Sequence, residues 1–218
     1  MTYLQAVNAV LARMREPQVT TLVGASDEVV LLVMSFVNDA KRKVEDAWRW
    51  NALQSEWDIT TADSDNLYSL TGSGNYAIID TIHNTTDRYV LKNYALRDLR
   101  KILLSYNGDT SEHIHGYAVD GQDGNGDVQI RVYPTPNSAK SLKVYGWQRT
   151  PDMSADADSL TIPSSPVIYE ALAYALRERG EVGGQTAAEV MGMARMFLAD
   201  AIAHDASMSF ESTIWETE

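Results

Sequence analysis

The eight residues 120–127 contain three aspartates and an asparagine at a spacing that could bind calcium: Asp120, Asp123, Asn125 and Asp127. Carboxylate and amide oxygens are the ligands that hard cations prefer. Taking Asp123 as the first position of an EF-hand loop, however, puts Val128 where a glycine is needed and Pro134 where a glutamate is needed. Asp-Gly and Asn-Gly pairs are typical of tight turns, so the sequence predicts a solvated loop rather than a metal site.

Two histidines, His113 and His115, are separated by one residue, so on a strand both rings would face the same side. A zinc site could use such a pair, with Asp109 or Glu112 as a carboxylate ligand. The chain has no cysteine, and no other histidine lies nearby. A pair of polar side chains on an exposed strand is the simpler interpretation, and a metal-binding module using His113 and His115 is the alternative.

No residue pattern typical of an enzyme occurs in the sequence. The glycine-rich segments 72–74 and 121–126 are not followed by a predicted helix, so they do not resemble a phosphate-binding loop. A G-x-S-x-G nucleophile elbow is absent, and the lack of cysteine excludes a thiol nucleophile. The sequence therefore predicts a protein that is not an enzyme and needs no cofactor.

The chain is acidic, with 18 Lys and Arg against 30 Asp and Glu, a formal net charge of −12. Residues 151–218 hold three basic and twelve acidic side chains and so carry most of this excess. Such a balance argues against a protein that grips nucleic acid, because phosphates are neutralised by Lys and Arg. No apolar run approaches the ~20 residues of a membrane span. The first ten residues lack a basic segment, and we expect no secretory signal.

Four stretches have the apolar spacing of amphipathic helices, and together with their end signals they cover about 2–16, 27–48, 165–180 and 186–204. The first should begin with a capping box formed by Thr2 and Gln5, and it should end before Pro17. The second should have Ser26 as its N-cap.

Between Trp57 and Met153 the pattern changes to the two-residue alternation of β-strands. The alternation is clearest in residues 128–133 and 142–147. An exception is 96–104, whose apolar positions suit a short helix. The sequence therefore predicts a small, mostly antiparallel β domain.

These elements predict an α+β fold: a four-helix bundle built from both chain ends, with a β domain inserted between its second and third helices. The expected boundaries are 1–52 and 160–205 for the bundle, 53–159 for the β domain and 206–218 for an extended C-terminal tail.

The expected tail is rich in glutamate, yet it carries Phe210, Ile214 and Trp215. Large apolar groups in such a tail are rarely exposed without a use. We expect the tail to dock on a partner through an aromatic anchor. The alternative is a tail folded back on its own bundle.

Two further groups could lie at contacts. Trp48, Trp50 and Trp57 occur where the second helix meets the β domain, and they are expected to form a junction core rather than a partner surface. The densest basic cluster is Lys41-Arg42-Lys43, which lies on a helix among acidic residues. A solvated, salt-bridged face is the default interpretation of that cluster, and a contact with an adjacent subunit is the alternative.

The opening segment 6–24, AVNAVLARMREPQVTTLVG, is followed by the long helix and Trp48-Arg-Trp50. This arrangement resembles tail tubular protein A, the head-to-tail adaptor family of short-tailed bacteriophages. The segment VQIRVYPTP at 128–136, the following strand and the closing pair of helices are also similar to phage adaptors. The chain departs from that family in the long turn at 121–126.

The resemblance implies a structural head-to-tail adaptor of the virion. Such a protein forms a ring, usually dodecameric, between the portal protein and a tail nozzle of the tail tubular protein B type. DNA passes through the channel during genome ejection without specific binding. The resemblance also implies synthesis in the host cytoplasm, no membrane contact, and the portal as the partner of the tail. In a ring, Lys41, Arg42 and Lys43 could meet an acidic strip of the adjacent subunit. A tail-completion or stopper protein of a long-tailed phage is an alternative.

Overall fold

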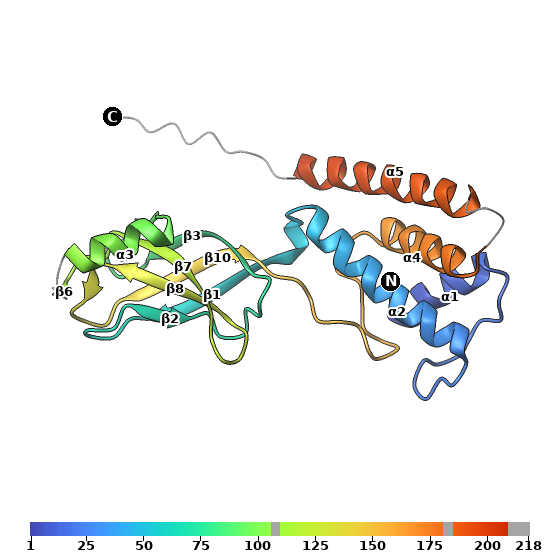
Figure 1. Cartoon of the computed structure of the whole chain (residues 1–218), viewed down its shortest axis with the longest axis horizontal. Coiled ribbons are helices and arrows are strands. Elements are labelled where there is room, and N and C mark those ends of the chain that lie inside the picture. Colours follow the sequence, from blue (N-terminus) through green and yellow to red (C-terminus); the bar gives the residue numbers. More distant parts are fainter. Residues whose placement is uncertain (106–109, 181–184, 209–218) are drawn as a thin grey trace. The chain divides into compact units, whose positions relative to one another are not determined.

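The computed structural model describes residues 1–105, 110–180 and 185–208 (Figure 1). The chain divides into two compact units. The helical unit comprises Met1–Leu53 and the chain from Thr150 onward, and the β unit comprises Gln54–Arg149. Helices and largely antiparallel sheets occur together, which confirms the predicted α+β class.

The helical unit contains four α-helices and one short 3-10 helix among its described residues: α1 (Tyr3–Arg13), α2 (Glu28–Ala47), η1 (Asn51–Leu53), α4 (Ser164–Glu178) and α5 (Gln185–Met208). The capping box predicted for α1 is confirmed, because the Thr2 hydroxyl accepts from the Gln5 amide while the Gln5 side chain accepts from the Thr2 amide. Helix α2 begins one residue later than predicted. Its N-cap is Asp27, not Ser26, and the Asp27 carboxylate accepts from the amides of Val29 and Val30.

Helices α1, α2 and α4 pack against one another, whereas α5 packs mainly on α4 (Figure 1). The contact between α4 and α5 includes the stacked rings of Tyr169 and Phe197, whose centroids are 4.7 Å apart. A bundle of four helices around a common core is therefore not confirmed. Three helices form the core, and α5 covers the outer side of α4.

The segment that returns from the β unit, residues 150–159, belongs to the helical unit and not to the β domain in which the sequence placed it. Its carbonyl groups at Asp156 and Asp158 accept from the free amide groups of the first turn of α1. The carboxylate of Asp156 also accepts from the Leu22 amide and the Thr21 hydroxyl, each at 2.7 Å. These acidic residues thus supply the acceptors that an N-terminal helix end needs.

Asn38 of α2 fastens the same segment. Its side chain donates to the Met153 carbonyl at 3.0 Å and accepts from the Met153 amide at 3.0 Å. It also donates to the Tyr3 hydroxyl, which in turn donates to the Met34 carbonyl at 2.9 Å. Burial raises the pKa of Tyr3 to about 12, with a further contribution from the charges of Asp152 and Asp158. Tyr3 is therefore a neutral hydrogen-bonding group at ordinary pH.

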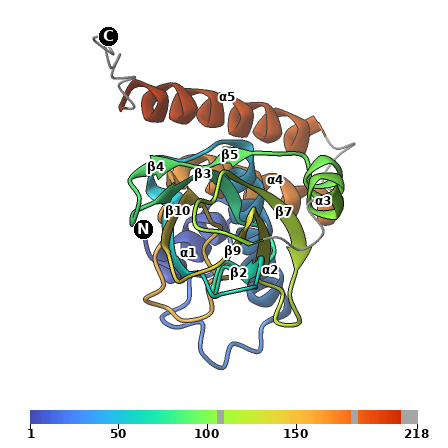
Figure 2. The same ribbon diagram turned by 90° about the vertical axis from the view of Figure 1, so that its left-hand side faces the viewer.

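The described part of the β unit contains ten strands and one helix: β1 (Gln54–Thr60), β2 (Leu67–Ser69), β3 (Ile78–Asn84), β4 (Tyr89–Val90), β5 (Lys92–Asn93), α3 (Leu96–Ser105), β6 (Thr110–Ser111), β7 (Gly116–Gln122), β8 (Val128–Tyr133), β9 (Thr135–Pro136) and β10 (Ser141–Trp147). Two four-stranded sheets have the orders β1-β10-β3-β4 and β2-β8-β7-β5 (Figure 2). All pairs are antiparallel except β5–β7 and β6–β9.

The core of the β unit lies between the two sheets and is built by alternation along the strands. Strand β1 pairs with β10 over its whole length, from Gln54↔Trp147 to Thr60↔Ser141, and places Trp57 opposite Val144. Both of these side chains are buried, as are the alternating apolar residues of β8. Helix α3 packs on β7, where Leu99 contacts Ala118. The predicted alternation and the predicted short helix are both confirmed.

Candidate interaction surfaces

Lys41 lies inside the helical unit, with 1% of its surface exposed. Its ammonium group is 3.2 Å from the Glu45 carboxylate, which is also buried. It donates to the carbonyl groups of Thr150 and Pro151 at 2.8 and 3.0 Å, and the Thr150 hydroxyl donates to Glu45. The expectation of a solvated face is wrong for Lys41, because position 41 falls on the buried stripe of α2 and faces the returning segment.

The other two basic residues of the cluster are accessible. Arg42 pairs with Asp39 of its own helix and with Asp152 of the returning segment. Lys43 pairs with Glu170 of α4. The contact between subunits stays a prediction, and it now rests on Arg42 and Lys43.

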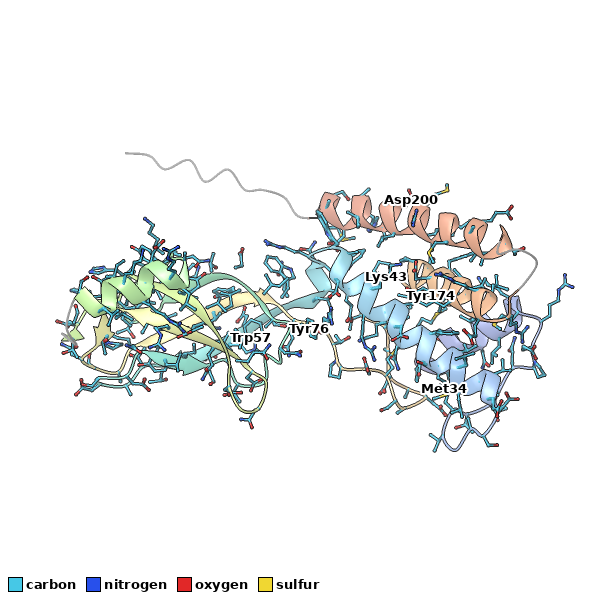
Figure 3. All side chains as sticks on the ribbon, viewed as in Figure 1. Met34, Lys43, Trp57, Tyr76, Tyr174 and Asp200 are labelled. Atoms are coloured by element: carbon cyan, nitrogen blue, oxygen red, sulfur yellow. The ribbon has the colours of Figure 1, made fainter. Side chains whose placement is uncertain are left out.

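An open recess lies between α2 and α4, beside Lys43. The Lys43 ammonium is 5.7 Å from the ring centroid of Tyr174, and that ring meets Phe36 edge-on at 5.9 Å (Figure 3). Glu170, which holds Lys43, has only 7% of its side chain exposed. The recess, called the α2/α4 groove below, has a volume of about 510 Å³ and is lined by Phe36, Asp39, Tyr174, Arg177 and Glu178. Its wall is thus held in place by ring contacts and an ion pair.

The outer side of α5 carries a second uncovered surface. Met193 and Met196 are 42% and 68% exposed, and Glu189 and Asp200 are exposed before and after them. With the spacing 189, 193, 196 and 200, these residues share one face of the helix. Figure 3 shows Asp200 on the side of α5 that points away from α4. We call these four residues the α5 ridge.

The three tryptophans at the predicted junction have different environments. Trp50 is 1% exposed, and its indole nitrogen donates to the Val44 carbonyl at 2.8 Å within the helical unit. Trp57 belongs to the core of the β unit. Trp48 is 39% exposed and donates to Asp205 of α5 at 3.0 Å. Trp50 is thus buried within the helical unit and Trp57 within the β unit. A junction core shared by the tryptophans stays a prediction.

His113 and His115 are both exposed, on either side of buried Ile114. Within the described ranges, no three His, Cys, Asp or Glu side chains come together as a metal site would require. Asp109, which was considered as a further ligand, lies outside the described residues. The structure thus gives the alternative metal-binding interpretation no support from the residues that it describes.

The loop at 120–127 is held by its own carboxylates. Asp123 accepts from the amides of Asn125 and Asp127 at 2.8 and 3.0 Å. Asp127 accepts from the amides of Gly72 and Gly74 at 3.0 and 2.8 Å, which ties two loops together. The predicted turn chemistry is confirmed.

Asp120 has a role that its sequence neighbours do not reveal. Its carboxylate pairs with Arg100 of α3 and Arg131 of β8, and only 5% of the side chain is exposed. Burial on its own would raise the pKa of Asp120, but hydrogen bonds and charge from the two arginines hold it below the ordinary value. This pair of contacts links α3 to the sheet beneath it.

We expect Asp120→Asn to weaken the β unit by roughly 1–3 kcal/mol at pH 7, the range for lost hydrogen bonds to charged groups. Because the folded-state pKa is lowered, the carboxylate stabilises the fold fully above the unfolded value of about 3.9 and ceases to do so as the pH falls through the lowered value. The loss caused by the substitution should therefore shrink below about pH 4. Urea unfolding of both proteins between pH 7 and pH 3 measures this difference in stability. A difference that does not change with pH would contradict the role of the ionised Asp120 carboxylate. Asp63→Asn, which changes an exposed carboxylate of the β unit outside this ion pair, is the comparison variant.

A recess of about 580 Å³ on the β unit is lined by several titratable side chains, including Glu56, His83 and Tyr145. His83 meets Tyr145 edge-on at 5.3 Å, and Glu56 in the same recess pairs with Lys143. Among the described lining residues, no hydroxyl is hydrogen-bonded to a His, Asp or Glu side chain as an activated nucleophile would be.

A model of the SU10 adaptor protein family matches residues 1–212, nearly the whole chain. This chain belongs to the SU10 adaptor protein family. A comparison with curated proteins finds no match.

Membership of the SU10 adaptor family indicates a phage head-to-tail adaptor with a structural role in the virion. It implies contact with portal and tail components. The predicted adaptor nature is thus supported, whereas the family match does not specify the tail tubular protein A type. No helix formed by the described residues is long and apolar enough to cross a membrane.

The tail residues Phe210, Ile214 and Trp215 lie outside the described residues of this SU10 adaptor family member, so their docking stays a prediction. Sequence reasoning missed the α2/α4 groove and the α5 ridge. One signal was available for the ridge: the apolar residues of 185–208 are not confined to one helical face. The groove had no such signal, because it depends on how α2 and α4 pack.

Proposed function

We propose that this protein forms a ring between the portal and the tail nozzle of a phage virion, through which the genome passes. The observation that carries the proposal is the SU10 adaptor family match over residues 1–212. The absence of an evident catalytic arrangement among the described residues is compatible with recognition by packing and charge.

In this proposal the helical unit contacts neighbouring subunits, and the C-terminal tail docks on the portal. The tail follows α5, which ends at Met208, and combines three large apolar residues with three glutamates. Burial of an aromatic anchor in a pocket is the usual source of affinity for such a segment. The tail would therefore act as the attachment point of each subunit.

The negative charge suits a channel for DNA. With a net charge of −12 per chain, acidic side chains near the bore would repel phosphates and so prevent the genome from adhering. Screening limits this effect to about 8 Å at physiological salt, so only residues close to the bore contribute.

Removal of residues 209–218 should abolish binding to the portal while leaving the fold unchanged, because every described helix and strand lies before residue 209. Cosedimentation with the portal measures binding, and the far-ultraviolet circular dichroism spectrum checks the fold. Full-length Phe210→Ser/Trp215→Ser should reproduce the loss, whereas Glu211→Gln/Glu216→Gln should retain most binding. Undiminished portal binding by the shortened chain would exclude the docking role of the tail.

Electron microscopy of the protein mixed with its own portal tests the ring itself. The expected result is a closed ring on the portal. If subunits bind the portal singly and leave no continuous ring, the proposed function is wrong in this respect.

A further inference from the structure

The helical unit has two uncovered surfaces of different shape. The α5 ridge is convex, whereas the α2/α4 groove is a recess floored by the rings of Phe36 and Tyr174. The residues of α4 that line the groove, such as Tyr174 and Glu178, differ from Tyr169, which contacts α5. The two surfaces therefore lie on different sides of α4.

Helix α5 is more apolar than its packing within the chain requires. The side that faces α4 includes buried Ala187 and Ala194 and the stacked ring of Phe197. The opposite side still exposes Met193 and Met196. A helix that is apolar on more than one side is normally covered on more than one side. The α5 ridge thus needs a partner that the single chain does not supply.

The side chains at the centre of each surface are chemically matched. Methionine is flexible enough to fill an irregular recess, and its sulfur makes favourable contacts with aromatic rings. The groove presents Phe36 and Tyr174, with Lys43 and Glu170 holding the Tyr174 end in place. Because these contacts exist in the single chain, the groove needs little rearrangement to accept a side chain.

The margins of the two surfaces carry charges of opposite sign, and the groove also contains two carboxylates, Glu178 and Asp39, of which Asp39 pairs with Arg42. Glu189 and Asp200 of the ridge make no ion pair with any described residue, and neither does Arg177 at the groove. The two ridge carboxylates and the guanidinium are thus all available to an incoming surface. Opposite charges placed in this way select the partner and its orientation.

We propose that the α5 ridge of one copy docks in the α2/α4 groove of a second copy, with Met193 and Met196 against the Phe36 and Tyr174 rings. The second copy is the occupant because one chain carries both matching surfaces. The contact joins two different patches, so it repeats from copy to copy and closes into a ring when the rotation allows. This inference rests on the proposed ring and identifies the surface that builds it.

The absence of cysteine allows a direct test. The variant Met196→Cys/Glu178→Cys carries one thiol on the ridge and one at the groove rim. Oxidised on the portal, it should give a ladder of covalent oligomers, because every copy is linked to two neighbours. An equal mixture of the two single variants should give only dimers, and each single variant alone should stay uncross-linked.

Charge reversal provides a second readout that needs no cross-link. Arg177→Glu should reduce the yield of rings on the portal roughly tenfold, since like charges then face each other across the contact. Adding Glu189→Arg/Asp200→Arg should restore the yield. Arg195→Glu, an exposed reversal on α5 outside the ridge, is the matched control and should change little.

The outcomes separate the inference from the proposed function. If unaltered protein forms rings but the double-cysteine variant gives no ladder of covalent oligomers, the proposed ridge-to-groove contact is rejected. The proposed ring on the portal is then retained. Dimers from a single variant alone would also overturn the contact, because they require a symmetric interface. If unaltered protein forms no ring on the portal, the proposed function itself fails.

Discussion

Replacing Lys41 by methionine should destabilise the helical unit by roughly 3–5 kcal/mol, the cost of leaving a buried charge without its partner. The substitution removes the ammonium group that faces Glu45 and two carbonyl groups of the returning segment. Glu45 would remain buried as an uncompensated carboxylate. Urea unfolding followed by helicity at 222 nm measures the loss.

Two further variants make the Lys41 prediction specific. Arg42 is the next residue after Lys41 and is more exposed. Arg42→Met should lower the free energy of unfolding by less than about 1 kcal/mol, because surface ion pairs contribute little to stability. Lys41→Met/Glu45→Leu should recover a large part of the loss, since an apolar pair of similar size needs no partner charge. A double variant as unstable as the single one would show that packing, rather than unpaired charge, causes the effect.

Trp50→Ala should destabilise the helical unit by roughly 3–5 kcal/mol, the usual range for removing a large buried aromatic side chain. The ring is 1% exposed, and the substitution also removes the donor to the Val44 carbonyl near the end of α2. Thermal unfolding measured by helicity is the appropriate assay. The variant should still fold at low temperature but should have a lower melting temperature than the unaltered protein.

Trp48→Ala is the matched control, because Trp48 is the same residue type two positions away and 39% exposed. Its loss removes one surface hydrogen bond to Asp205 and should cost less than about 1.5 kcal/mol. Equal losses for the two variants would contradict the assignment of Trp50 to the core. A portal-binding defect in Trp48→Ala without loss of stability would instead indicate a contact surface.

Local signals in the sequence predict much of the fold. The Thr2–Gln5 capping box and the alternation in 128–133 each depend on neighbouring residues, and both occur in the structure. The predicted N-cap of α2 was wrong by one residue, because Ser26 and Asp27 are both residue types that favour this position. Only the structure shows that the Asp27 carboxylate is the group that accepts from the first amides of the helix.

Features that depend on distant parts of the chain were not predictable in the same way. Burial of Lys41 requires the carbonyl groups of Thr150 and Pro151, more than one hundred residues further along the chain. The assignment of 150–159 to the helical unit likewise depends on bonds to α1. Asp120 was considered as a calcium ligand, but its arginine partners come from α3 and β8. In each case the deciding partner lies far away in sequence.

The full-length pairing of β1 with β10 places the start of the first strand of the β unit beside the end of its last strand, with Gln54 opposite Trp147. A domain whose ends are adjacent can be inserted into a host fold without separating the host's own elements. Residues 54–149 therefore have the geometry of an exchangeable cassette, and we expect that they can be lengthened, trimmed or replaced while the helical unit keeps its fold. The same property would let a fluorescent or affinity module replace the cassette in a virion.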